Sequence, residues 1–214
     1  MTENPHPPKA LNQCFMADDQ FDSLYPLYVQ LLSKQHWTPL HVIKPAARFL
    51  APRRGVKVLD IGSGAGKFCL AGAYLTPYAN FYGVEQRPHL LTVAEEVKTL
   101  LRLNNVQFLL QNFAALDFSE YDSFYFFNAF YENLPGKDKI DTLVTFSQKI
   151  YQEYSFCLFE KLSRLRPGSR LVTYHSIEGQ VPPCFHLQEQ ESTSLLKFWI
   201  KRGSAPNRQF FVIQ

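Results

Sequence analysis

One stretch, VKVLDIGSGAGKF at residues 56–68, constrains the fold more than any other part of the sequence. Its first six residues are mostly apolar and predict a short buried strand. The three alternating glycines that follow give the backbone the freedom to turn sharply into a helix. In open α/β sheets, ligands bind outside the carboxyl ends of the strands, at turns of this kind. The stretch therefore predicts an α/β protein with a ligand site close to residues 60–66.

Strand-like and helix-like segments alternate beyond residue 52, as a doubly wound sheet requires. Strands are expected at 56–61, 80–85, 106–112, 122–128 and 169–175, and helices at 67–75, 89–103, 137–151 and 154–165. The segments 192–202 and 208–214 are separated only by a turn-rich loop, so they predict an antiparallel hairpin. We expect a mostly parallel seven-stranded sheet with helices on both faces and an antiparallel last strand.

The first 52 residues lack this alternation. Residues 1–17 are polar and proline-rich, which predicts a flexible arm. Apolar residues at helical spacing predict one helix from Asp19 to about Leu32 and a second over 39–51. The expected organisation is an arm at 1–17, a helical cap at 18–52 and a ligand-binding domain at 53–214.

Composition limits the classes of function. The chain has 214 residues, 46% of them hydrophobic, which suits one globular core. The four cysteines are far apart and form no CxxC pair, so we expect neither a metal site nor disulfides. No apolar run has the length of a membrane span or of a signal peptide, so a cytoplasmic protein without membrane contact is expected.

Three ligands bind loops of this general type: ATP, a dinucleotide and S-adenosylmethionine. A P-loop requires glycine where this chain has Ile61, and Ser or Thr where it has Phe68. Lys67 is therefore expected only to open a helix, with its ammonium group in solvent. The dinucleotide fingerprint GxGxxG also differs from the GxGxG spacing found here.

Asp60 distinguishes the two remaining ligands. A carboxylate at the mouth of the loop repels a pyrophosphate, whereas it attracts the ammonium and sulfonium groups of S-adenosylmethionine. The sequence thus favours S-adenosylmethionine. An NAD-dependent oxidoreductase and a non-catalytic cofactor-binding partner protein remain open as alternatives.

The segment VLDIGSGAGKF resembles the first motif of class I S-adenosylmethionine-dependent methyltransferases, and the likeness extends from about Thr38 to Gln214. The sheet of that family also ends in an antiparallel strand. The resemblance implies that Glu85 binds the ribose hydroxyls, that Asn112 and Phe113 contact the adenine, and that Thr38 closes over the methionine end. The complete cofactor site that it implies comprises Thr38, Asp60, Gly62, Ser63, Gly64, Gly66, Glu85, Asn112, Phe113 and Asn128.

The segment NAFYENLPG at 128–136 follows the fourth expected strand and should face the methyl acceptor. It resembles the corresponding segment of the non-SET lysine methyltransferases of the telomeric-silencing type and their bacterial relatives. In those enzymes an Asn and a Phe at this spacing line the lysine channel. The resemblance gives Asn128 and Phe130 this role, and with Tyr131 they form the expected catalytic set. Candidate acid, base or positioning groups are Tyr131, Glu132, Tyr174 and His175.

The acceptor stays open at this level. A protein lysine and a small-molecule amine or hydroxyl fit equally well. RNA is less well supported: residues 161–214 carry 8 Lys and Arg against 3 Asp and Glu, but without the dense basic clusters of a dedicated nucleic-acid binder.

Overall fold

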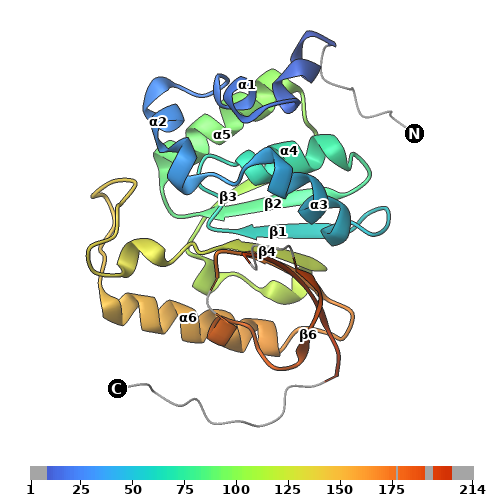
Figure 1. The fold of residues 1–214 in the computed structure, drawn as a ribbon, viewed down its shortest axis with the longest axis vertical. Coiled ribbons are helices and arrows are strands. Elements are labelled where there is room, and N and C mark those ends of the chain that lie inside the picture. Colours follow the sequence, from blue (N-terminus) through green and yellow to red (C-terminus); the bar gives the residue numbers. More distant parts are fainter. Residues whose placement is uncertain (1–8, 177, 191–194, 204–214) are drawn as a thin grey trace.

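A seven-stranded sheet runs through the molecule, which is a computed structural model describing residues 9–176, 178–190 and 195–203 (Figure 1). The strand order is β3-β2-β1-β4-β5-β7-β6. The strands are β1 (Lys57–Ile61), β2 (Asn80–Glu85), β3 (Val106–Leu110), β4 (Ser123–Phe127), β5 (Arg170–Tyr174), β6 (Phe185–Gln190) and β7 (Leu196–Lys201).

The pairing of these strands confirms the expected fold. β1 to β5 are parallel, and β7 is antiparallel to both of its neighbours, β5 and β6. The hairpin is nevertheless formed by different residues from those predicted, because β6 at 185–190 pairs with β7. β6 is an edge strand whose side chains are exposed after Phe185, so it lacks an apolar signature. The predicted strand at 208–214 lies outside the described residues.

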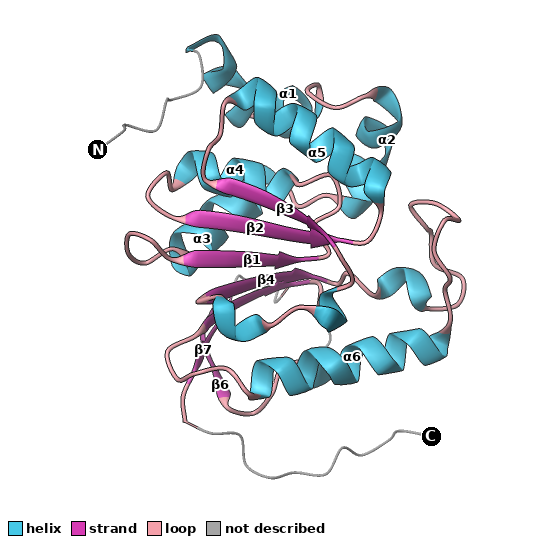
Figure 2. Cartoon of the chain, turned by 180° about the vertical axis from the view of Figure 1, so that it is seen from behind, coloured by secondary structure: helices cyan, strands magenta, loops and turns pink. Residues whose placement is uncertain are grey.

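Helices cover both faces of the sheet (Figure 2). Successive strand residues point to opposite faces, so Val58 packs with the helices α3 to α5, whereas Leu59 packs with α6. The helices are α1 (Asp18–Asp22), α2 (Leu27–His36), α3 (Leu40–Leu50), α4 (Lys67–Leu75), α5 (Pro88–Leu101) and α6 (Gln148–Ser163). The 3-10 helices are η1 (Lys9–Phe15), η2 (Phe113–Ala115), η3 (Phe118–Glu120), η4 (Tyr131–Asn133) and η5 (Glu178–Gln180). Among the described residues, none of the helices combines the length and the apolar character needed to cross a bilayer.

Three helix predictions need correction. The helix expected from Asp19 is divided into α1 and α2 at Pro26, which lacks the N–H that a continuous helix requires. The two helices expected at 137–151 and 154–165 are replaced by the single helix α6. It begins after Ser147, whose side chain caps it by accepting the N–H of Ile150. The preceding residues 134–147, hereafter the strap, form no helix.

Part of the expected arm is also ordered. Residues 9–15 form η1, and the ring of Phe15 stacks on Tyr74 of α4 with ring centroids 3.6 Å apart. Phe15 belongs to the same hydrophobic cluster as the cap and the sheet. The boundaries of the arm, the cap and the ligand-binding domain stay a prediction. Residues 1–8 of the expected arm lie outside the described part of the chain.

Lys67 differs most from its expected environment. It does open α4, but its side chain is only 3% exposed, and its ammonium lies 2.7 Å from both Asp18 and Asp22 of α1. Burial of a lysine is favourable only when such partners replace water. Close by, the hydroxyl of Tyr25 donates to the carbonyl of Ala65. The cap is thus fastened to the glycine loop by polar contacts as well as by apolar packing.

We predict that Lys67→Met lowers the free energy of unfolding by about 3–5 kcal/mol, because it leaves two carboxylates without their buried partner. The matched control is Lys149→Met, since Lys149 and its partner Glu153 are both exposed on α6. The control should change stability by less than about 1 kcal/mol. Urea unfolding of the two variants checks this, and equal losses would contradict the role given to Lys67.

Candidate functional site

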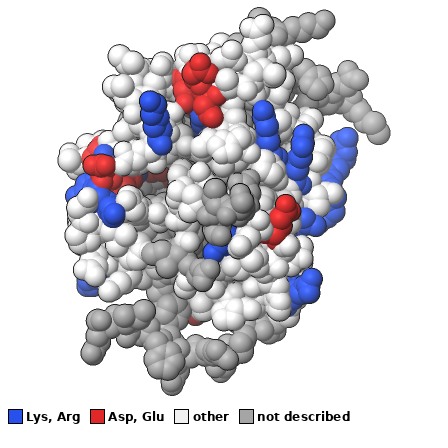
Figure 3. Space-filling view, in the orientation of Figure 1, with Lys and Arg blue, Asp and Glu red and all other residues white. Residues whose placement is uncertain are grey.

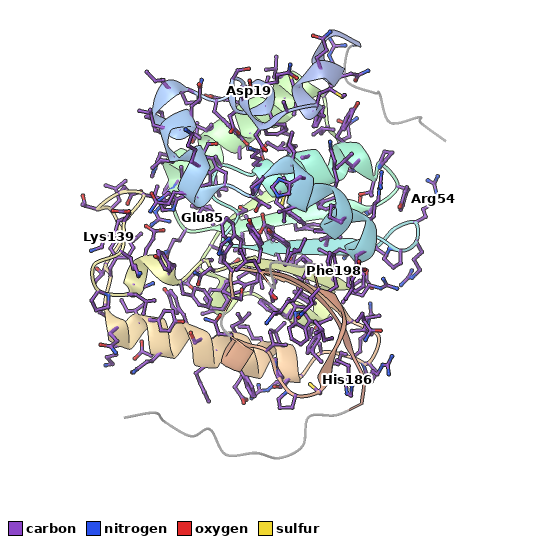
Figure 4. The ribbon with its side chains drawn as sticks, in the orientation of Figure 1. Asp19, Arg54, Glu85, Lys139, His186 and Phe198 are labelled. Atoms are coloured by element: carbon purple, nitrogen blue, oxygen red, sulfur yellow. The ribbon has the colours of Figure 1, made fainter. Side chains whose placement is uncertain are left out.

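The carboxyl ends of β1 to β5 meet at one edge of the sheet, and the residues predicted from the sequence gather there. Figure 4 shows Glu85 at this edge, on the side of the molecule that carries Lys139. Three cavities lie at the edge, with volumes of about 370, 50 and 30 Å³. We call them the large, adenine-side and inner cavities, the second after Asn112 and Phe113, which the sequence predicts to contact adenine. Gly62 borders all three, so they are parts of one site.

At two glycines of the loop, neighbouring residues leave no room for a side chain. Gly62 has φ +79°, and a Cβ at this position would lie 2.5 Å from the Cβ of Ala129. Gly64 has φ +54°, and a Cβ there would lie 2.4 Å from the ring of Trp37. The loop therefore passes against protein on both sides, which excludes side chains at these positions. The third glycine of the motif, Gly66, has φ +80° and forms the N-cap of α4.

Glu85 connects the end of β2 to the glycine loop. Its carboxylate is 5% exposed and accepts the backbone N–H groups of Gly64 (3.2 Å), Gln86 (2.8 Å) and Arg87 (3.0 Å). Burial raises the pKa of Glu85, and the nearby Arg87 guanidinium and these hydrogen bonds oppose the rise. Glu85 borders both the large and the adenine-side cavities.

Asp60 lies deeper, on the wall of the inner cavity. Burial raises its pKa to about 8, a hydrogen bond from Cys69 works against the rise, and the charge of Glu85 adds to it. Asp60 is therefore largely protonated at neutral pH in the absence of a cation. A bound cation would lower this pKa and restore the carboxylate, so the attraction expected from the sequence depends on the ligand itself.

Thr38 and Ser63 border the inner cavity together with Asp60. The hydroxyls of Thr38 and Tyr125 are 3.0 Å apart and share a hydrogen bond. The buried hydroxyl of Ser63 has no hydrogen-bond partner within the described part of the chain. The structure thus brings both residues to the loop, beside Asp60.

Asn112 and Phe113 border the adenine-side cavity. The Asn112 side chain accepts the N–H of Ala114 and donates to the Tyr154 hydroxyl, so both ends of its amide are already engaged. The ring of Phe113 stacks on Phe130, with centroids 5.0 Å apart. Phe130, expected beside the acceptor, is 3% exposed and belongs to this aromatic cluster.

Asn128 and Tyr131 border the large cavity, as does His175. Asn128 and His175 directly follow the paired strands β4 and β5, and both have left-handed backbones, with φ of +40° and +53°. Such conformations are strained in residues other than glycine and concentrate at functional sites. The Asn128 amide oxygen is buried and has no hydrogen-bond partner among the described residues.

Sequence reasoning missed several residues of this edge. Trp37 covers Gly64, and His36 borders both the large and the inner cavities. Arg87 is 5% exposed and forms ion pairs with Glu132 (2.8 Å) and Asp141 (3.1 Å). Of these, only Arg87 carried a signal in the sequence, since it follows Glu85 by two residues at the end of a strand.

Comparison with protein families decides what kind of site this is. The family described as a methyltransferase domain matches residues 52–203, more than two thirds of the chain. The chain belongs to this methyltransferase family. A search of curated protein sequences gives no match.

Among solved structures of similar fold, one contains S-adenosylmethionine and another contains S-adenosyl-L-homocysteine. An RNA methyltransferase from Salinibacter ruber, in complex with S-adenosyl-L-homocysteine, is 22% identical over 80% of this chain and 97% of its own, with a TM-score of 0.56. A mutant of MtNAS in complex with S-adenosylmethionine is 13% identical over 90% and 70%, with a TM-score of 0.54. A precorrin-6y C5,15-methyltransferase from Geobacter metallireducens GS-15 is 13% identical over 78% and 90%, with a TM-score of 0.51.

The chain therefore combines membership of a methyltransferase family with a fold found in proteins that bind S-adenosylmethionine or S-adenosyl-L-homocysteine. The two alternatives left open by the sequence, an oxidoreductase and a non-catalytic partner protein, are set aside by the family.

We predict that the stability of the methyltransferase falls relative to that of its Asp60→Asn variant as pH rises from about 4 to about 8. In this window the folded protein keeps a proton on Asp60 that the unfolded chain, with an aspartate pKa near 3.9, has released. Above about pH 8 the difference should level off. Thermal unfolding across pH measures it.

The control is Asp117→Asn, because hydrogen bonds from Ser119 lower the pKa of Asp117. Its stability difference from the wild type should stay constant between pH 5 and 8. A constant difference for Asp60→Asn over the same window would show that Asp60 is not protonated in the folded protein.

Proposed function

We propose that the methyltransferase transfers a methyl group to an amine, with the side chain of a protein lysine as the acceptor. The observation that carries this proposal is the amide oxygen of Asn128, a buried acceptor without a protein partner among the described residues. A buried oxygen in this state is costly unless a ligand donates to it. The amine of the acceptor is such a donor.

The walls of the large cavity suit a lysine side chain. Phe127, Tyr131 and Tyr174 contribute aromatic rings, against which the aliphatic part of a lysine can pack. The carboxylates of Glu85 and Glu132 border the same cavity, but both are paired with Arg87, so they add little net charge. The aromatic walls are therefore the feature that supports an amine on an aliphatic chain.

The proposed cofactor placement follows the three cavities. Glu85 accepts the ribose hydroxyls, Phe113 and Asn112 contact the adenine, and the methionine end extends towards Thr38 and Asp60. Support comes from the carboxylate at the junction of the large and adenine-side cavities and from the glycine loop beside it. The sulfonium methyl group would then point into the large cavity, towards Asn128.

Methyl transfer to nitrogen requires a neutral amine aligned with the methyl group. Burial lowers the pKa values of His36 and His175, which both border the large cavity. Both imidazoles are therefore neutral at pH 7, so each has an unprotonated nitrogen that can relay the proton lost by the incoming ammonium to water. Asn128 orients the amine, and the cofactor supplies the activated methyl group.

RNA is a second candidate, favoured by lysines around the opening. Lys34 borders the large cavity, the ammonium of Lys137 lies 4.9 Å from the ring of Tyr131, and that of Lys139 lies 4.7 Å from the ring of Phe146. The Salinibacter ruber protein of similar fold is an RNA methyltransferase. Against this, Figure 3 shows acidic and basic side chains mixed over the face in view, without one continuous basic surface.

Incubation with tritiated S-adenosylmethionine and separate protein and RNA pools tests the proposal. We expect label in protein, recovered as N-methyllysine after acid hydrolysis. Asn128→Ala should lower this transfer by at least about 100-fold, because a misplaced nucleophile loses its alignment with the methyl group.

Cofactor affinity should change less than about threefold in Asn128→Ala, and the exposed Asn104→Ala serves as the matched control with wild-type transfer. Label found in RNA alone would exclude a protein lysine as the acceptor and support RNA instead. Normal transfer to lysine by Asn128→Ala would exclude the orienting role of Asn128.

A further inference from the structure

The strap crosses the site between the cap and α6. In Figure 1 it is the yellow loop at the left of the sheet, between α2 and α6. Ile140 of the strap borders the large cavity, and Phe146 borders the adenine-side cavity. The strap therefore contributes a wall to both parts of the site. It consists of turns and irregular backbone, as do the glycine loop and the turns after β2, β3 and β4 that form other parts of the wall.

A buried cluster of charged side chains forms the first attachment of the strap. The guanidinium of Arg87 lies 2.8 Å from Glu132, 3.1 Å from Asp141 of the strap and 3.7 Å from Glu85. His89 adds a contact to the same Asp141 oxygen at 3.4 Å. The side chain of Arg87 is 6% exposed and that of Asp141 is 18% exposed, so their ion pair is largely shielded from water. Arg87 thus links the strap to the residue proposed to bind the ribose.

A second tether joins the strap to the cap. The side-chain amide of Gln35, near the end of α2, donates to Asp138 at a distance of 2.8 Å. This hydrogen bond is exposed, so it is weaker than the Arg87 cluster and exchanges readily with water. The backbone N–H of Ile140 also donates to Glu132, at a distance of 2.9 Å. The strap is consequently attached both to the Arg87–Glu132 cluster and to the cap.

The adenine-side cavity is a narrow part of the site proposed for the cofactor. Its volume is about 50 Å³, whereas the adjoining large cavity has about 370 Å³. The walls of this cavity include Phe113 and Tyr154, which pack in a cluster of aromatic rings, and Phe146 of the strap. Because the strap lacks regular backbone hydrogen bonding and is exposed at residues 135–139 and 142–143, it can move at low cost.

We propose that the strap is a gate over the adenosine end of the cofactor, closed by the Arg87–Asp141 ion pair and the Gln35–Asp138 hydrogen bond. The gate opens for cofactor to enter and for S-adenosylhomocysteine to leave, and it closes during methyl transfer. This inference rests on the proposed placement of the adenosine beside Glu85 and Phe113. It adds that the rate of cofactor exchange is set by strap contacts that do not touch the reacting atoms.

Stopped-flow binding of S-adenosylhomocysteine to the full chain tests the gate. Asp141→Asn weakens the inner latch, Gln35→Ala removes the outer tether, and Glu153→Gln on α6 is the matched control in an exposed ion pair. We expect the association and dissociation rate constants of Asp141→Asn both to rise at least about fivefold, with a smaller rise for Gln35→Ala. The dissociation constant should change less than either rate constant, because a gate acts on both directions.

Thermal unfolding of each variant establishes that it is folded under the conditions of the binding experiment. Rate constants of Asp141→Asn and Gln35→Ala equal to those of the control would overturn the gate and leave cofactor binding intact. A rise in dissociation alone would also overturn it, since Asp141 would then stabilise bound cofactor without gating its entry. A wild-type protein that does not bind S-adenosylhomocysteine would overturn the proposed cofactor site and the gate together.

Discussion

The carboxylate of Glu85 is the point on which the rest of the site depends. Three backbone N–H groups from two segments converge on it, so it fixes the glycine loop after β1 against the turn after β2. Its negative charge, buried at 5% exposure, is tolerated because Arg87 and these donors compensate the lost hydration. Arg87 in turn holds Glu132 and, through Asp141, the strap. The Glu85–Arg87 pair therefore connects the glycine loop to the strap.

Much of the fold could be predicted because its signals are local. The apolar runs of β1 to β5 and the helical spacing of α3, α4 and α5 are readable within single segments, and the family match and sheet order agree with them. The absence of a helix in the strap and the presence of β6 could not be predicted from the sequence. The strap is held by contacts with Arg87 and Gln35, and β6 is held by pairing with β7, so neither depends on its own periodicity.

The candidate site likewise contains some features that could be predicted from the sequence and others that could not. Gly62 and Asn128 directly follow β1 and β4, and Glu85 ends β2, so their position at the sheet edge comes from topology alone. The partners of Lys67 could not be found, because Asp18 is separated from it by 49 residues. The rings of Phe130 and Phe113 stack because 3-10 helices at the ends of β3 and β4 bring them together, which spacing in the sequence does not reveal.

The central claim, that Glu85 binds the cofactor, is tested most directly by calorimetry of S-adenosylmethionine binding to the wild type and to Glu85→Gln. The account predicts binding by the wild type and a loss of about 2 kcal/mol or more, roughly 30-fold in affinity, in the variant, because charge-assisted hydrogen bonds to the ribose are lost. Circular dichroism spectra and thermal unfolding should show that the variant keeps its fold. Wild-type affinity in a folded Glu85→Gln variant would contradict the account.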